Sequence, residues 1–130
     1  MASGESEKGP VIEVETEAEF VREESHPTLN HYHFAYHINI KNKGDAPAQL
    51  ISRHWIITNG KGAIHEVKGE GVVGKQPVLN PGQEFTYTSA CPLDTPIGMM
   101  QGSYHMVDGN GRPFDVAIEP FILTATASHN

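Results

Sequence analysis

The feature that most constrains this chain is a strict alternation of apolar and polar side chains. In residues 11–20 the even positions carry Ile, Val, Thr, Ala and Phe, whereas four odd positions carry glutamates, namely Glu13, Glu15, Glu17 and Glu19. Successive side chains of a strand point to opposite faces, so the pattern predicts a strand with one buried and one solvated face. Because such a run would extend roughly 40 Å, we expect a bend or bulge near residues 16–18.

The same alternation recurs along most of the chain. Residues 31–40 place tyrosines, phenylalanine and isoleucines inward and histidines outward, and further strand segments follow at 63–67, 83–90, 102–107 and 112–123. Residues 49–58 are apolar on both faces at several positions, which suggests a more central strand. Asn59-Gly60 predicts a hairpin turn with positive φ, and Pro120 should kink the last strand or place it on an edge. No segment has convincing helical periodicity. About seven antiparallel strands therefore predict a two-sheet β-sandwich.

Three single residues refine this fold class. Trp55 lies on the third strand, where sandwiches often place a central core aromatic, and Tyr104 is placed to form a tyrosine corner. Cys91 is the only cysteine, so a disulfide-pinned immunoglobulin domain is excluded. The prediction is a fibronectin type III-like (immunoglobulin-like) sandwich.

Length and charge limit the possible functions. The 130 residues suffice for one domain, which we predict at 11–124, between a disordered acidic tail at 1–10 and a short tail at 125–130. Residues 1–24 hold eight acids and two bases, a net of −6 out of −7 for the chain. Without a basic patch, nucleic-acid binding is not expected. No apolar run is long enough for a membrane span, and a lone cysteine without a signal-like N-terminus favours a cytoplasmic protein.

Residues 69–74, GEGVVG, have the glycine spacing of dinucleotide-binding loops. That motif needs a helix N-terminus to receive the pyrophosphate, and Pro77 and Pro81 prevent a helix from starting after the loop. A Rossmann site is therefore excluded, which leaves a structural turn or bulge or an anion-binding nest of main-chain amides for pyrophosphate. The nest would comprise Gly69, Gly71 and Gly74, flanked by Lys68 and Lys75.

Histidines and glutamates offer two candidate metal sites. His31, His33 and His37 share the outward face of one strand, and imidazoles about 7 Å apart can share a divalent ion such as cobalt. Ordinary exposed histidines are the alternative. The glutamates of residues 13–19 carry oxygen ligands that suit magnesium. No loop gathers them around one point, so we interpret them as a solvated face that discourages pairing with other molecules.

Arg53 and Cys91 are the remaining polar candidates. Arg53 shares the parity of Trp55, so it should be partly buried and need a partner, for which the carboxylate of Glu70 is a candidate. Cys91 is in step with inward-facing aromatics and should behave as a small hydrophobe rather than a nucleophile.

Four motifs make the chain recognisable: R-x-W-x-I-T at 53–58, GEGVVG at 69–74, P-G-x-x-F-x-Y-T-S at 81–89 and T-P-x-G-x-M-x-G at 95–102. From Val11 to Leu123 the chain resembles the ApaG family, also called CorD. The resemblance implies a fibronectin type III-like sandwich, an association with cobalt and magnesium tolerance, and a gene neighbouring that of a diadenosine tetraphosphate hydrolase. Similar domains in eukaryotic F-box and DNA-polymerase-interacting proteins act as interaction modules.

The sequence thus favours a non-enzymatic module that binds an unidentified protein partner. The alternative is a sensor of a small anion, pyrophosphate or a nucleotide polyphosphate, or of a divalent cation, through the glycine loop or the strand histidines. An enzyme acting on a polyphosphate is least favoured, because the sequence holds no recognisable set of nucleophile, base and orienting residue. No cofactor is expected, and the oligomeric state stays open.

Overall fold

The computed structural model describes residues 9–125, which form eight β-strands and two short 3₁₀ turns but no α-helix. The elements are β1 (Ile12–Phe20), η2 (Arg22–Glu24), η3 (Pro27–Leu29), β2 (Tyr32–Asn42), β3 (Ala48–Asn59), β4 (Ile64–Glu70), β5 (Val78–Leu79), β6 (Glu84–Leu93), β7 (Ile97–Asp108) and β8 (Pro113–Thr124). Residues 1–8 and 126–130 of the two predicted tails lie outside the described part of the chain.

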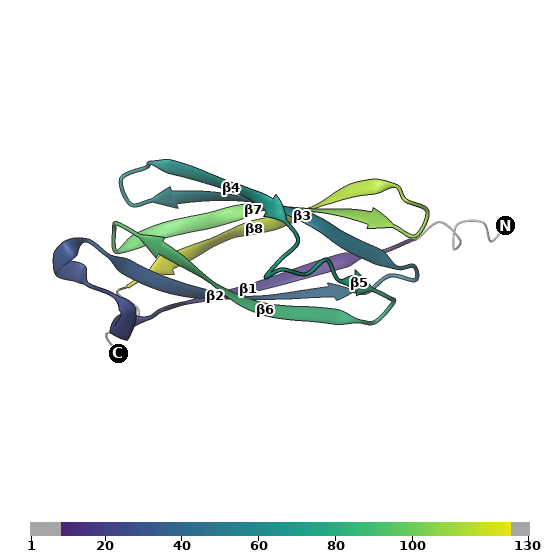
Figure 1. The fold of residues 1–130 in the computed structure, drawn as a ribbon, viewed down its shortest axis with the longest axis horizontal. Coiled ribbons are helices and arrows are strands. Elements are labelled where there is room, and N and C mark those ends of the chain that lie inside the picture. The colour runs from purple at the N-terminus through teal and green to yellow at the C-terminus, as the bar shows by residue number, and fades with distance from the viewer. Residues whose placement is uncertain (1–8, 126–130) are drawn as a thin grey trace.

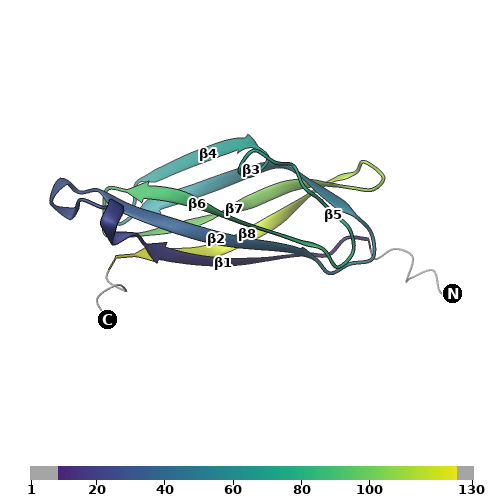
Figure 2. The same cartoon turned by 60° about the horizontal axis from the view of Figure 1, so that its bottom comes forward.

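The strands form two antiparallel sheets that pack face to face (Figures 1 and 2). One sheet has the order β1-β2-β6, and the other has the order β4-β3-β7-β8, with the short β5 paired to the start of β3. This order confirms the fibronectin type III-like sandwich predicted from the sequence. The eighth strand, β5, is a two-residue segment inside the long loop between β4 and β6.

The core lies between the sheets and is built from the inward positions of the alternating pattern. On β2 the predicted parity holds, because Phe34, Tyr36 and Ile38 are buried whereas Ala35 and His37 between them are partly exposed. Trp55 of β3 is 2% exposed and sits at the centre of the aromatic packing, edge-on to Tyr36 and Tyr104. The prediction of a central core tryptophan is therefore confirmed.

The first strand differs from its prediction. We expected a bend or bulge near residues 16–18, but β1 pairs with β2 in one unbroken register from Ile12 to Phe20. The reason is that β2 is eleven residues long, so each residue of β1 has a partner, and the chain turns away only at η2.

One of two local predictions from turn-forming and strand-breaking residues is only partly correct, and the other is confirmed. The β3–β4 hairpin exists, but its positive φ is at Gly62 rather than at Asn59-Gly60. Asn59 Oδ1 accepts the amides of Lys61 and Ala63, which closes a longer loop. By contrast, the Pro120 prediction is confirmed: β8 is an edge strand, and its register with β7 shifts where Pro120 lies.

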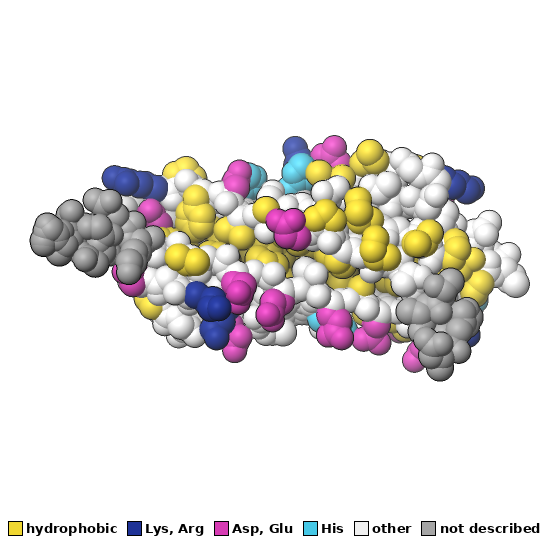
Figure 3. Space-filling model, turned by 180° about the vertical axis from the view of Figure 1, so that it is seen from behind, with side chains coloured by type: hydrophobic (Ala, Val, Ile, Leu, Met, Phe, Trp, Pro, Cys, Tyr) yellow, Lys and Arg dark blue, Asp and Glu magenta, His cyan; other side chains and the backbone are white. Residues whose placement is uncertain are grey.

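The two long sides of the sandwich are closed differently. On one side the edge strands β1 and β8 of opposite sheets lie beside each other, and a band of hydrophobic side chains runs between them (Figure 3). On the other side β4 and β6 stand apart and leave a cleft. No helix among residues 9–125 is long and apolar enough to span a membrane.

Candidate functional site

The glycine loop folds into a tight turn next to the edge strand β4. The Gly71 amide donates to the Ile51 carbonyl over 2.8 Å, and Val72 and Lys75 exchange two main-chain hydrogen bonds of 2.8 and 2.9 Å. Between them Val73 and Gly74 both have positive φ, 44° and 79°. This is a two-residue hairpin turn of the I′ kind, and Val73 is an unusual occupant because a β-branched residue is strained there.

These hydrogen bonds bear on the anion-binding hypothesis. The amides of Gly71, Val72 and Lys75 already donate to main-chain carbonyls, and Gly71 and Val72 are buried. A pyrophosphate would have to compete with bonds that hold the turn together, although Lys68 is exposed beside it. Pyrophosphate binding at this loop stays a prediction, whereas the turn accounts for its positive-φ glycines.

Arg53 joins the loop to the core. Its Nη1 donates to the main-chain carbonyls of Glu70, at 3.1 Å, and Gly71, at 2.8 Å. A Cβ at Gly69 would lie 2.8 Å from the guanidinium, so the first glycine of the motif makes room for Arg53. The predicted partner, the carboxylate of Glu70, is therefore replaced by the main-chain carbonyl of the same residue. The Glu70 carboxylate does not take part, because the guanidinium lies over the backbone of residues 69–71, where carbonyl oxygens accept its hydrogen bonds.

The cleft between β4 and β6 is the best-formed candidate site. It has a volume of about 340 Å³ and is lined by side chains of β2, β3, β4, β6 and β7, namely Tyr36, Arg53, Trp55, Ile57, His65, Val67, Ser89, Ala90, Cys91, Pro92 and Met100. A concave, mainly apolar surface with a few convergent polar groups is typical of a ligand site.

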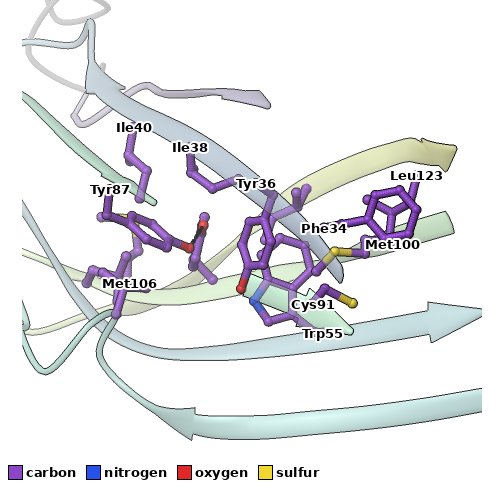
Figure 4. Close-up of a cluster of buried hydrophobic side chains, with 14 of the residues drawn as sticks. Phe34, Tyr36, Ile38, Ile40, Trp55, Tyr87, Cys91, Met100, Met106 and Leu123 are labelled. Atoms are coloured by element: carbon purple, nitrogen blue, oxygen red, sulfur yellow. Dashed lines mark hydrogen bonds between the residues drawn. The ribbon is translucent and has the colours of Figure 1, made fainter. Parts of the chain in front are cut away.

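Trp55 contributes an unsatisfied polar group to this cleft. Its Nε1 is buried and has no hydrogen-bond acceptor in the described part of the chain. The Trp55 indole packs edge-on against the ring of Tyr36, with centroids 5.3 Å apart (Figure 4), and Cys91 belongs to the same lining. Buried donors are nearly always paired with protein, water or ligand, so an unpaired one at a cleft marks a place where an acceptor is missing.

Burial determines the protonation state of two ionisable side chains in the lining of the cleft, Cys91 and Tyr36. Burial raises the pKa of the Cys91 thiol to about 11 and also raises the pKa of the Tyr36 hydroxyl, against a smaller lowering by its hydrogen bond with Ser89. Both groups are therefore neutral at pH 7. Arg53 is the cation of the lining, and a high thiol pKa makes Cys91 a poor nucleophile, as the sequence predicted.

A second hollow extends the cleft toward the β3–β4 hairpin. It has a volume of about 340 Å³ and shares Ile57, His65 and Pro92 with the first. Ile64, which is 66% exposed, stands on its rim. The open side of the sandwich is thus a continuous apolar groove along β4.

Tyr104 does not form the predicted tyrosine corner. It lies in the middle of β7 and is fully buried, and its hydroxyl shares a 2.6 Å hydrogen bond with the hydroxyl of Tyr87 on β6. The bond links the two sheets through the core. Both hydroxyls are buried, and their burial is the largest cause that raises the pKa of each tyrosine. Sequence position near a strand start suggested a corner, but β7 begins earlier than expected.

The three histidines of the proposed metal site are on one face but do not converge. The rings of His31 and His33 have centroids 6.3 Å apart, whereas His37 is held by Thr88 Oγ1 at 2.7 Å and Glu19 Oε1 at 2.9 Å. In residues 9–125 no group of three or more His, Cys, Asp or Glu side chains is arranged to hold a metal ion. Metal binding by these histidines stays a prediction.

Thr88, His37 and Glu19 form a hydroxyl–imidazole–carboxylate chain that sequence reasoning missed. The residues come from three adjacent strands, so only the register of β1, β2 and β6 could have revealed it. The side chains of His37 and Glu19 are 35% and 62% exposed, on the outer face of a sheet. An acyl-transfer site also needs preorganised oxyanion donors in a sheltered pocket. We therefore interpret the chain as cross-strand hydrogen bonding.

Comparison with known proteins identifies the family. The sequence pattern that defines the ApaG domain matches residues 22–108. The chain is 56% identical over 112 residues to Protein ApaG of Aromatoleum aromaticum, covering 86% of this chain and 88% of that protein. It is 57% identical over 104 residues to Protein ApaG of Bordetella pertussis, with coverages of 80% and 79%.

Solved structures agree with the sequence comparison. The crystal structure of a Bordetella pertussis protein described as ApaA superposes with a TM-score of 0.88 at 52% identity, covering 90% of this chain and 95% of that one. Fold, motifs and sequence identity therefore converge, and the chain belongs to the ApaG family.

Proposed function

We propose that this ApaG protein is a non-enzymatic interaction module that binds an extended segment of a partner protein along the edge strand β4. The observation that carries this proposal is the outer edge of β4. Among the described strands β4 pairs with β3 alone, from Glu70 to Ile64, so its second edge presents main-chain donors and acceptors. An extended peptide can add to such an edge as a further strand.

Two of the other edges, those of β8 and β1, are less suited to strand addition. β8 carries Pro113 and Pro120 and a register shift, and proline removes a donor from the ladder. β1 packs beside β8 and carries the glutamates that discourage pairing. β4 has no proline, no register shift with β3, and mostly exposed side chains.

The apolar groove beside β4 supports the same proposal. Strand addition gains affinity from main-chain hydrogen bonds and specificity from pockets that take alternate side chains. The exposed Ile64 and the groove lined by Ile57 and Pro92 offer such pockets to a partner. The cobalt and magnesium tolerance implied by the family resemblance would then arise through the partner protein, with the domain acting as an adaptor.

The small-anion or divalent-metal sensor receives less support. The glycine loop uses its buried amides internally, and His37 is engaged with Thr88 and Glu19. An anion or metal would have to displace these bonds before binding.

Site-specific photocrosslinking tests the proposal. A benzophenone amino acid is placed at Ile64, which is 66% exposed on β4, and for comparison at Ile122, which is 55% exposed on β8. In extract from the source cells, the Ile64 position should give one discrete adduct and the Ile122 position none. Hydrogen exchange of the purified complex should then show protection of the β4 amides. Equal adducts at both positions, or protection confined to β8, would contradict the proposal.

A further inference from the structure

The floor of the cleft between β4 and β6 combines two features that the interaction module does not use. The first is Trp55 Nε1, a buried donor with no acceptor in the described part of the chain. Leaving such a donor unpaired costs about 1–3 kcal/mol, a cost that a native core seldom carries without a water or ligand to meet it. Trp55 is itself 2% exposed and lines the cleft.

The second feature is a cation in the lining of the cleft. Arg53 lines the cleft, and none of the ion pairs found among residues 9–125 includes it. Its Nη1 is held by two main-chain carbonyls, and these contacts fix the guanidinium without neutralising it. A guanidinium has five N–H donors, so donors remain for a ligand.

Most of the remaining lining is apolar, and Tyr36, His65 and Ser89 are its other polar side chains. Ile57, Val67, Pro92 and Met100 supply apolar surface. Cys91 remains a thiol at pH 7 because burial raises its pKa to about 11. The cleft therefore offers the charged donors of Arg53 within a hollow of about 340 Å³. The indole nitrogen of Trp55, which also belongs to the lining, is buried and has almost no accessible surface of its own.

We propose that this cleft binds a small molecule with an apolar body and one carboxylate, whose oxygens accept hydrogen bonds from Arg53 and, once the buried indole tips toward the cleft, from Trp55 Nε1. A carboxylate matches the guanidinium geometry and supplies the acceptor that the indole lacks. The apolar body fills the hollow between Val67 and Met100. The volume is at the lower end for ligand pockets, so the ligand has the size of a single aromatic ring with a short acidic arm.

The inference goes beyond the partner-binding role. The carboxylate site is formed by Arg53 and Trp55 of β3, whereas the proposed partner strand adds to the outer edge of β4 and uses the neighbouring hollow, which shares Ile57, His65 and Pro92 with the cleft. The two kinds of binding have different readouts, namely the Trp55 indole resonance and the crosslink at Ile64. Binding of a small acid can therefore fail or succeed independently of photocrosslinking at Ile64.

The chain provides its own reporter for the test. Trp55 is the only tryptophan, so a nitrogen-15 correlation spectrum contains a single indole N–H resonance, from the donor in question. Phenylacetate is titrated against the whole protein, with phenylacetamide as the neutral analogue and acetate as the acid without a ring. The expected result is a saturable downfield shift of the indole resonance with phenylacetate, with a Kd of about 1 mM or tighter. Each control should bind at least about tenfold more weakly.

Two variants assign the site. Arg53→Gln should weaken phenylacetate binding by about tenfold or more. Because Arg53 also holds the glycine loop, Val67→Phe provides a second route that leaves the guanidinium intact and fills the cleft, and it should abolish the shift. Val78→Phe, the same change at an exposed residue of β5 outside the cleft, should leave the affinity unchanged.

Three outcomes would overturn the proposal. The first is an indole resonance that stays in place under phenylacetate in the folded protein, as expected if an internal water satisfies Trp55. The second is equal binding of phenylacetamide or acetate. The third is unchanged phenylacetate binding in Val67→Phe.

Discussion

The two long sides of the sandwich differ in how well they cover the core. Each side is where an edge strand of one sheet meets an edge strand of the other, so each could expose the core. At β1 and β8 the gap is filled by half-buried apolar side chains (Figure 3), namely Ile12, Val14, Ala18, Phe20, Phe114, Val116 and Phe121. At β4 and β6 the gap stays open as a cleft of about 340 Å³.

The difference separates a side that contributes stability from the side at which we propose that recognition takes place. The closed side contributes apolar burial, the main favourable term in folding, and contains no unpaired buried side-chain donor among the described residues. The open side instead holds a buried donor without an acceptor in the described part of the chain and a cation without an acidic partner there. Features that cost folding free energy are thus confined to one side, as expected for a binding face.

The largest predicted effect concerns the turn that borders the open side. Gly71 has a φ of +64°, and a Cβ there would lie 2.3 Å from the Lys75 carbonyl oxygen. We therefore expect Gly71→Ala to lower the free energy of unfolding by about 3 kcal/mol or more, measured by urea denaturation. Gly74→Ala is the control, because its added Cβ meets nothing within 4 Å and it should cost about 1 kcal/mol. Similar losses in both variants would mean that steric fit at Gly71 is unimportant.

A second prediction uses pH to probe the wall of the cleft. Burial raises the pKa of Cys91 from 9.0 to about 11, so the folded protein favours the neutral thiol. This stabilisation is fully present below pH 9 and is lost as the pH rises to about 11, which amounts to about 2 kcal/mol. Urea denaturation at pH 8, 9, 10 and 11 should show the decline.

The matched variant Cys91→Ala should remove the part of this decline that begins near pH 9. The remaining loss should begin near pH 10, where the buried tyrosines start to ionise in the unfolded chain, since burial raises the pKa of Tyr87 and Tyr104. An identical pH profile in Cys91→Ala would assign the whole effect to the tyrosines.

The fold was predictable because its signal is local. Inward and outward parity is a property of neighbouring residues, so the strands, their faces and the central position of Trp55 follow from the alternation. Pro120 allowed an equally local prediction. Proline has no N–H to donate to a neighbouring strand, so it is confined to an edge strand, a strand start or a bulge.

The candidate site was less predictable because it depends on long-range geometry. Sequence reasoning paired Arg53 with the carboxylate of Glu70, since charge is visible in a sequence, whereas the register of β3 and β4 brings main-chain carbonyls to the guanidinium. The cleft itself depends on the separation of β4 and β6, which no local pattern encodes. GEGVVG was conspicuous as a motif, yet Gly69 accommodates Arg53 and the other glycines have the positive φ of a turn.

The third prediction tests the link between the sheets on which both sides depend. The hydroxyls of Tyr87 and Tyr104 share a buried 2.6 Å hydrogen bond, so Tyr104→Phe leaves the Tyr87 hydroxyl without its partner. The expected loss is about 1–2 kcal/mol. The double variant with Tyr87→Phe should recover part of it, because both polar groups are then removed. A double variant as unstable as the sum of the single ones would show that the hydroxyls act independently.

The smallest predicted effect compares one residue type on both sides. Val14 on β1 and Val67 on β4 are both half-buried valines packed against the core, but Val67 also lines the open cleft. Truncating a side chain costs more where neighbours enclose the space it leaves. Val14→Ala should therefore cost about 1 kcal/mol and Val67→Ala about half of that in urea denaturation of the protein alone. With phenylacetate present the order should reverse, because Val67→Ala also removes apolar contact with the ligand. Equal costs under both conditions would mean that the two sides are energetically alike and that the cleft is only a gap in packing.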